Sequence, residues 1–230
     1  MGTSGWNAHG RRSSASTRFR PVPDRELDAG ELRRISTATL AHYDGSADSF
    51  WQATRDHDVR QNIEALLRHL PPGRRRVLDF GCGPGRDLAA FTALGHDAVG
   101  LDGARNFVAM ARRFSGCEVL HQDFLALALA PESFDGVFAN ASFFHVPAQE
   151  MPRVLGALRT ALRPGGVFFA SNPHGANEEG WNRGRYGSYL DAPTWRRVVM
   201  AAGFTELEHY YRPAGLPRAQ QPWLATVWRR

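Results

Sequence analysis

The chain has 230 residues, of which 43% are hydrophobic, and a formal net charge of +5; this is enough apolar sequence for one large domain. All 28 basic residues are arginine. Residues 1–36 hold seven of them against four acids, and Arg229 and Arg230 add two more charges, so residues 37–228 sum to zero. Because a nucleic-acid surface needs excess positive charge on the folded body, no nucleic-acid partner is expected.

The rest of the composition excludes further classes of protein. Cys82 and Cys117 lack the spacing of zinc ligands, and the scattered histidines show no ligand pattern, so no metal is expected. The first residues lack the apolar stretch of a secretory signal, and no run reaches the roughly 18 apolar residues of a membrane span. We therefore expect a cytoplasmic protein without a membrane partner.

The N-terminal part of the chain falls into two predicted segments. Residues 1–36 are expected to form a flexible basic arm, and residues 37–230 the folded domain. A helix–turn–helix pattern covers residues 24–56, and residues 59–70 place apolar side chains at helical spacing before a proline stop. We expect residues 37–70 to form a helical lid over the rest of the domain.

Strand and helix patterns alternate through the remainder of the chain. Predicted strands lie at residues 76–81, 97–102, 117–123, 134–142, 167–173, 205–213 and 222–230, and predicted helices at residues 85–95, 104–114, 149–166 and 191–204. Repeated strand–helix units predict a doubly wound α/β fold with a mostly parallel seven-stranded sheet and helices on both faces. The order of the strands does not follow from this pattern.

A glycine-rich loop follows the first of these strands. It has the spacing G-x-G-x-G, with Gly81, Gly83 and Gly85, and Asp79 comes just before it. Glycines allow close approach to a ligand and backbone turns with positive φ. The spacing is tighter than the G-x-G-x-x-G of dinucleotide sites, which favours an adenosyl ligand without a phosphate, such as S-adenosyl-L-methionine.

Polar residues end the next three strands, where ligands of open α/β sheets bind. Asp102 and Gly103 follow the second strand, where a carboxylate can accept hydrogen bonds from ribose hydroxyls. The third strand ends in a group suited to adenine, which is formed by Gln122, Asp123 and Phe124. The fourth strand is followed by a segment expected to border the transferable methyl, from Asn140 to Pro147. Each acid could instead be a helix cap or a surface turn, but their combination is more specific than any member.

These motifs resemble those of the class I S-adenosylmethionine-dependent methyltransferases, with their Rossmann-like fold, over residues 40–230. Residues 50–63, 171–191 and 206–230 look more particularly like the C-terminal methyltransferase domain of ovothiol-biosynthesis enzymes and its stand-alone relatives. That resemblance implies methylation of the imidazole π nitrogen of mercaptohistidine, an imidazole thiol amino acid. It also implies functional coupling to a sulfoxide synthase, which is absent from this chain.

Several residues are candidates for particular roles in such a site. The expected lid contributes Tyr43, Trp51 and Arg55 to cofactor binding, together with the loop, the strand-end residues and Asn140. The candidates for catalysis, chiefly for fixing the tautomer of the acceptor ring, are Asn140, His145, Tyr186 and Tyr211. The acceptor is expected to contact Phe144, Asn172, Arg185, Tyr186, Tyr210 and Arg212, with residues 171–191 forming a substrate loop insertion and an arginine holding a carboxylate.

Other functions fit the same sequence less well. A methyltransferase could act on another small amine, thiol or carboxylate. A nicotinamide-dependent oxidoreductase is disfavoured by the glycine spacing. A module that binds an adenosyl ligand without catalysis is disfavoured by the polar, aromatic insertion at residues 171–191, which indicates a second ligand.

Overall fold

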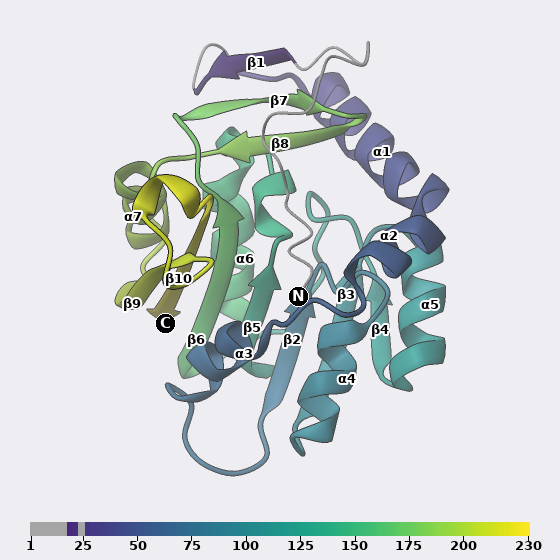
Figure 1. Ribbon diagram of the computed structural model, residues 1–230, viewed down its shortest axis with the longest axis vertical. Helices are drawn as coiled ribbons and strands as arrows, with labels where there is room; N and C mark the ends of the chain where they lie inside the picture. The colour runs from purple at the N-terminus through teal and green to yellow at the C-terminus, as the bar shows by residue number, and fades with distance from the viewer. Residues whose placement is uncertain (1–17, 23–25) are drawn as a thin grey trace.

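The computed structural model describes residues 18–22 and 26–230 (Figure 1). The helices are α1 (Ala29–Gly45), α2 (Ala47–Thr54), α3 (Arg60–Leu67), α4 (Arg86–Ala93), α5 (Arg105–Ser115), α6 (Met151–Ala161) and α7 (Ala192–Ala201). The strands are β1 (Arg18–Pro21), β2 (Arg76–Phe80), β3 (Asp97–Asp102), β4 (Glu118–His121), β5 (Phe134–Asn140), β6 (Leu162–Pro173), β7 (Glu178–Asn182), β8 (Arg185–Tyr189), β9 (Thr205–Arg212) and β10 (Trp223–Arg229).

The main sheet has seven strands in the order β4-β3-β2-β5-β6-β10-β9. Strands β4, β3, β2, β5 and β6 run parallel, and β10 runs antiparallel to both of its neighbours. The predicted mostly parallel seven-stranded sheet is therefore confirmed. The chain winds outward from β2 through β3 to β4 and then returns to β5, so a topological switch point lies between β2 and β5. Ligands of doubly wound folds bind at such a point.

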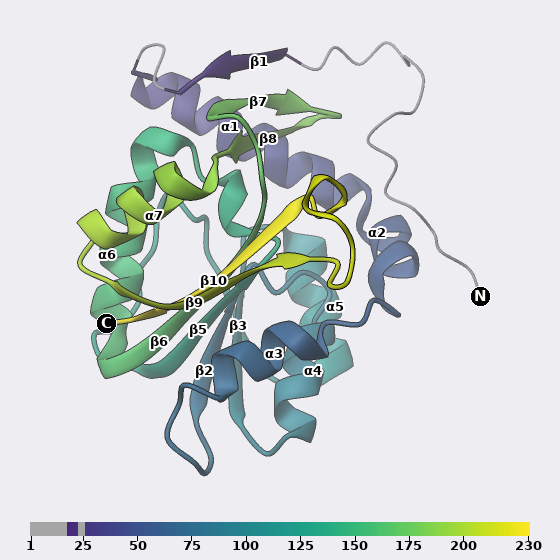
Figure 2. The same ribbon diagram turned by 60° about the vertical axis from the view of Figure 1, so that its left-hand side comes forward.

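Helices cover both faces of this sheet (Figures 1 and 2). Successive side chains of β2 point to opposite faces of the sheet, so they belong to two separate hydrophobic clusters. Leu78 packs with Leu155 of α6 and Trp195 of α7 on one face. On the other, Val77 belongs to a second cluster that includes Leu66 of α3, and residues of α4 and α5 complete it. The apolar strands thus read as continuous hydrophobic runs because both of their faces are buried.

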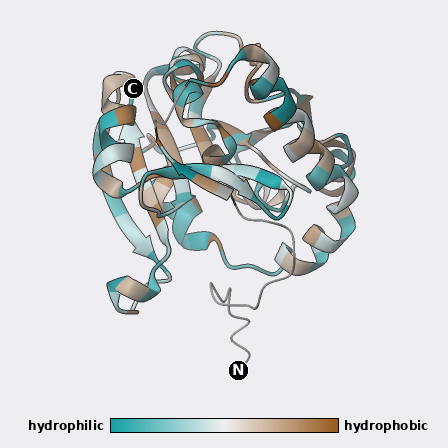
Figure 3. Cartoon of the chain, turned by 90° about the horizontal axis from the view of Figure 1, so that it is seen from above, coloured by the Kyte–Doolittle hydropathy of each residue, from teal (hydrophilic) through white to brown (hydrophobic). Residues whose placement is uncertain are grey.

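A second, antiparallel sheet has the order β1-β7-β8. It crosses the top of the molecule, above the carboxyl ends of the parallel strands, and its strands carry both hydrophobic and hydrophilic residues (Figure 3). The predicted insertion at residues 171–191 is thus not a loop: it contains the end of β6 and a hairpin of β7 and β8. Strand β1 completes this sheet from a distant part of the sequence.

The predicted N-terminal boundary differs from the structure. Within the expected arm of residues 1–36, residues 18–21 form β1, and α1 begins at Ala29, where Asp28 and Glu31 form a reciprocal capping box. Residues 1–17 and 23–25 lie outside the described part of the chain. The expected lid of residues 37–70 comprises most of α1 with α2 and α3. None of the helices described is both long and apolar enough to cross a bilayer.

Candidate active site

A cavity of about 1020 Å³ opens at the carboxyl ends of β2, β3, β5 and β6. Helices α1 and α2 and the β7–β8 hairpin form its opposite walls. Thirteen of the predicted site residues line it: Tyr43, Trp51, Gly81, Gly83, Asp102, Gly103, Asp123, Phe124, Asn140, Phe144, His145, Arg185 and Arg212. Sequence segments that lie far apart thus meet at the switch point of the sheet.

The three glycines of the loop have different structural roles. Gly81 has φ 79°, and a Cβ there would lie 2.4 Å from Ser142 Cβ. Gly85 has φ 98°, and a Cβ there would lie 2.8 Å from Ala111 Cα of α5. Gly83 lines the cavity, where a Cβ would meet only Phe50, at 3.8 Å. The outer glycines therefore allow tight packing, and the middle one leaves room for a ligand.

Asp102 is fixed at the end of β3 by backbone donors. Its Oδ2 accepts a hydrogen bond from Gly83 N at 3.0 Å, and its Oδ1 accepts one from Ala104 N at 2.8 Å. Burial raises the pKa of this carboxyl to about 6 despite these donors. Each oxygen keeps a lone pair for a further donor, so Asp102 can accept hydrogen bonds from a ligand diol.

The predicted adenine end of the cavity is built from β4 and the residues after it. Asp123 accepts hydrogen bonds from the Ser36 hydroxyl of α1 and from Leu125 N, the latter at 2.8 Å. The ring of Phe124 stacks on Phe80 with centroids 4.1 Å apart and lies against Gly81. Gln122 turns away from the cavity and binds the backbone of Ala128, so it folds the loop and does not line the site.

Asp79 lies beneath the glycine loop, outside the cavity wall. Its side chain is 2% exposed, and its Oδ2 has no hydrogen-bond partner among the described residues. Burial and the nearby Asp87 raise the pKa of Asp79 well above its usual value. An orphaned carboxylate oxygen below a loop with space above Gly83 fits a ligand that brings a positive charge to this place.

A hydrogen-bond chain that we did not predict holds Asn140. Asn62 Nδ2, from the buried face of α3, donates to Asn140 Oδ1 at 2.8 Å, and Asn140 Nδ2 donates to Asp87 Oδ2 at 3.0 Å. Arg86 forms an ion pair with Asp87, and the Tyr210 hydroxyl donates to Asn62 Oδ1 at 2.9 Å. Asn140 is therefore fixed by protein groups. Tyr210 joins this chain from behind the cavity instead of lining it.

His145 and Tyr43 form a second hydrogen-bonded pair, which does line the cavity. His145 Nε2 lies 2.7 Å from the Tyr43 hydroxyl, and His145 Nδ1 lies 2.6 Å from the carbonyl oxygen of Tyr186. Burial lowers the pKa of His145 to about 4, and raises that of Tyr43 to about 12. Both groups are therefore neutral near pH 7.

Comparisons with known proteins agree with this architecture. Residues 77–166 match the family model of the methyltransferase domain. The crystal structure of 1,6-didemethyltoxoflavin-N1-methyltransferase from Burkholderia thailandensis, with bound 1,6-didemethyltoxoflavin and S-adenosylhomocysteine, superposes with a TM-score of 0.75 at 23% identity, covering 92% of this chain and 94% of that one. The chain has the class I methyltransferase fold.

Curated relatives share only part of their length with this methyltransferase fold. A ubiquinone biosynthesis O-methyltransferase from Paraburkholderia phymatum is 35% identical over 151 residues, which are 63% of each chain. A 24-methylenesterol C-methyltransferase 2 from Oryza sativa is 34% identical over 125 residues, which are 51% of this chain and 33% of the relative. These two relatives are thus named for chemically different acceptors, and this chain covers less than two thirds of the length of each.

The far end of the methyltransferase cavity is aromatic and basic. Phe144 contacts the rings of Tyr189 and Trp223, with centroids 5.9 and 6.4 Å away. Arg185 lies over the Tyr43 ring, with its Cζ 5.9 Å from the centroid, and it has no ion pair among the residues described. Arg185 Nε and Arg212 Nε are both buried without a hydrogen-bond partner. This end fits a flat ring that carries an anionic group.

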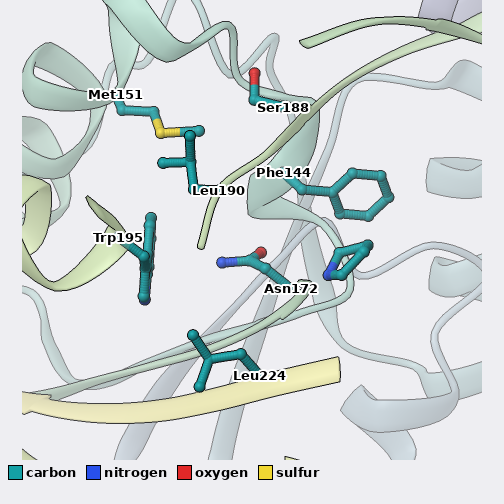
Figure 4. Close-up of a pocket in the computed structure, with 8 residues that line it drawn as sticks. Phe144, Met151, Asn172, Ser188, Leu190, Trp195 and Leu224 are labelled. Carbon is teal, nitrogen blue, oxygen red and sulfur yellow. The ribbon is translucent and has the colours of Figure 1, made fainter. Parts of the chain in front are cut away.

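The remaining predicted site residues lie outside the cavity. Asn172 points into a separate small apolar pocket of about 10 Å³, between Phe144, Trp195 and Leu224 (Figure 4). The Tyr186 side chain faces Arg20 and Glu179, so only its backbone carbonyl reaches His145. Arg55 is exposed beside Asp56. Tyr211 packs under Arg218, whose Cζ lies 3.5 Å from the centroid of the Tyr211 ring.

Two signals in the sequence could have identified the missed residues. Arg86 and Asp87 follow the last loop glycine directly, so they had to lie close to any ligand of the loop. Asn62 precedes Leu66 by four residues, which places an amide on the apolar face of α3. Tyr189 and Trp223 carried no comparable signal, because strand pairing in the second sheet and at the sheet edge brings them to the cavity.

No group of three or more histidine, cysteine or acidic side chains suited to a metal ion occurs in the described part of the chain. Asp102 and Asp123 are held by hydrogen bonds from protein donors, as described above.

Proposed function

We propose that the protein is an S-adenosyl-L-methionine-dependent methyltransferase for a small molecule. The observation that carries the proposal is Asp102: a buried carboxylate, held by Gly83 N and Ala104 N, faces the same cavity as an aromatic and basic second region. The residues present fit the cofactor. Asp102 would accept from its ribose, Asp123 and Phe124 would flank adenine, and Asp79 would balance its ammonium from below the loop.

The cofactor supplies a methyl group on a positively charged sulfur, which leaves as a neutral thioether. The protein therefore has no leaving group to protonate, and its main contribution is alignment of the acceptor, which can lower the barrier by several kcal/mol. Asn140 ends β5 and lines the cavity, and its amide is fixed by Asn62 and Asp87. We assign to Asn140 the role of positioning the reacting groups where the methyl is transferred.

We further propose that the acceptor is mercaptohistidine, methylated on the imidazole π nitrogen as in ovothiol biosynthesis. Three chain segments support this by their resemblance to the ovothiol enzymes. Arg185 and Arg212 line the cavity, each with a buried Nε that has no hydrogen-bond partner among the described residues, so they could bind its carboxylate. Phe144 provides an aromatic surface for its ring. The structural neighbour from Burkholderia thailandensis described above is likewise an N1-methyltransferase, of 1,6-didemethyltoxoflavin.

On this proposal a sulfoxide synthase provides the precursor of the acceptor. The alternative acceptor is another small amine, thiol or carboxylate. An Arg pair facing the cavity favours an acceptor with an acidic group over a simple amine.

Two measurements test the proposal, one for the enzyme class and one for the acceptor. Calorimetry with S-adenosylhomocysteine should show binding at one site per chain; no binding would refute the methyltransferase assignment. Mass spectrometry after incubation with S-adenosylmethionine and mercaptohistidine should show one added methyl on the ring. Binding of the cofactor product without methylation of mercaptohistidine would leave the enzyme class in place and exclude this acceptor.

A further inference from the structure

The hydrogen bonds of His145 fix the position of its proton. Nδ1 lies 2.6 Å from the Tyr186 carbonyl oxygen, which can only accept a hydrogen bond. Nδ1 must therefore carry the proton, since a bare Nδ1 would place two lone pairs against each other at this distance. In the neutral ring this leaves Nε2 as a hydrogen-bond acceptor.

The state of His145 in turn fixes the direction of the Tyr43 hydroxyl. The Tyr43 oxygen lies 2.7 Å from the bare Nε2, so Tyr43 donates its only proton to His145. Edge-on contacts with the rings of His42 and Phe50, and a tilted contact with Phe107, hold the tyrosine ring in place. The hydroxyl has no proton left to give, and it can interact with a ligand only through its lone pairs.

Tyr43 lines the cavity from α1. Asp102 at the end of β3 and Arg185 and Tyr189 of β8 all act electrostatically on its hydroxyl. Besides Tyr43 itself, Arg185 and His42 are the charged or titratable groups that act on His145, and both oppose its protonation. Tyr43 and His145 both line the cavity in which a bound acceptor would lie.

We propose that Tyr43 is a specificity-determining residue that accepts a hydrogen bond from an N–H or O–H group of the methyl acceptor, and that His145 is the positioning residue that imposes this polarity. The inference rests on the proposed methyl transfer and defines the acceptor further. A ring nitrogen that donates to Tyr43 leaves the other ring nitrogen with its lone pair free for the methyl. The pair thus selects one tautomer of an azole acceptor.

Nuclear magnetic resonance tests the polarity without any acceptor. In protein labelled with ¹⁵N-histidine and bound to S-adenosylhomocysteine, long-range ¹H–¹⁵N spectra at pH 7 should show His145 with Nδ1 protonated and Nε2 bare. The His145→Asn variant assigns the signals, and Tyr43→Phe should shift the Nε2 resonance because it removes the donor. A His145 protonated on Nε2, or on both nitrogens, would overturn the proposal.

Kinetics with matched acceptors test the specificity. Mercaptohistidine is compared with its analogue already methylated on the other ring nitrogen, which cannot donate to Tyr43. Wild-type protein should prefer mercaptohistidine by about 10-fold in kcat/KM, the size expected of one hydrogen bond, and Tyr43→Phe should lose most of this preference. An equal preference in both proteins would contradict the role of Tyr43. If wild-type protein binds S-adenosylhomocysteine but methylates neither compound, the acceptor proposal fails and the spectra alone decide the polarity of Tyr43.

Discussion

The side chain of Asp102 combines burial, a fixed orientation and unused lone pairs. Two backbone amides set its direction, so replacing it should remove ligand contacts without a compensating rearrangement. We expect Asp102→Ala to weaken binding of S-adenosylhomocysteine by about 1.5–3 kcal/mol, as for other hydrogen bonds to a charged group. Calorimetry measures this. Asp97→Ala, at the exposed start of the same strand, is the control and should bind normally; equal affinities of the two variants would remove Asp102 from the site.

Arg185 is the residue most directly assigned to binding the proposed acceptor. Its Nε is buried without a partner, and a carboxylate would supply one. We predict that Arg185→Gln raises the KM for mercaptohistidine by at least about 10-fold, because a charge-assisted hydrogen bond is lost. Its affinity for S-adenosylhomocysteine should change little, which separates an acceptor role from a general defect. An unchanged KM would argue against the carboxylate contact.

Whether a site residue could be predicted from the sequence depended on the structural feature that brings its side chain to the cavity. Asp102 and Asp123 could be assigned to the cavity because each ends a strand, and parallel strands end at one edge. Asn172, Tyr186 and Tyr211 were expected there too, but alternation along β6, β8 and β9 turns their side chains elsewhere, and a shift of one residue reverses the face. Side-chain direction within a strand was therefore the information that the sequence lacked.

At the scale of elements, the glycine loop gives a sharp test of packing. Gly81 and Gly95 have similar φ angles, 79° and 84°, but a Cβ at Gly81 would meet Ser142 at 2.4 Å, whereas nothing lies within 4 Å at Gly95. Gly95→Ala should cost about 1–2 kcal/mol of unfolding free energy, the cost of the left-handed conformation alone. Gly81→Ala should lose more, and should also lose affinity for S-adenosylhomocysteine. Equal destabilisation in denaturant titrations would show that the loop relaxes around the added methyl.

The regular elements differed in how far local sequence could predict them. Helix α7 begins as predicted, with the Asp191 side chain accepting from Thr194 N at 2.8 Å, because capping is a local interaction. The β7–β8 hairpin was expected to be a loop. Its residues are polar and rich in glycine. Its first strand, β7, pairs with β1, which lies about 160 residues away in the sequence, and Arg20 of β1 forms an ion pair with Glu179 of β7. Pairing over such a distance leaves no local pattern.

At the scale of the whole molecule, buried titratable groups should set the pH dependence of stability. His145 is held neutral, with its pKa lowered to about 4 from the usual 6.5, so below pH 6.5 the unfolded chain binds a proton that the folded chain does not. The stability contributed by neutral His145 is therefore complete above pH 6.5, and it is lost as the pH falls towards 4. Asp102 has the opposite sign: its pKa is raised to about 6, so its burial reduces stability as the pH rises from about 4 to 6.

The two effects can be separated by comparing variants over the same pH range. A pKa of about 4 for His145 in place of 6.5 corresponds to roughly 3 kcal/mol. Between pH 6.5 and 4 the unfolding free energy of wild-type protein should therefore fall by up to that amount more than that of His145→Asn. Asp102→Ala should instead remove the opposing decline above pH 4. Urea titrations at half-unit intervals of pH measure both differences. Parallel curves for wild type and His145→Asn would mean that the imidazole is as easily protonated in the folded protein as in the unfolded chain, and the fixed polarity of the Tyr43 hydroxyl would then have no basis.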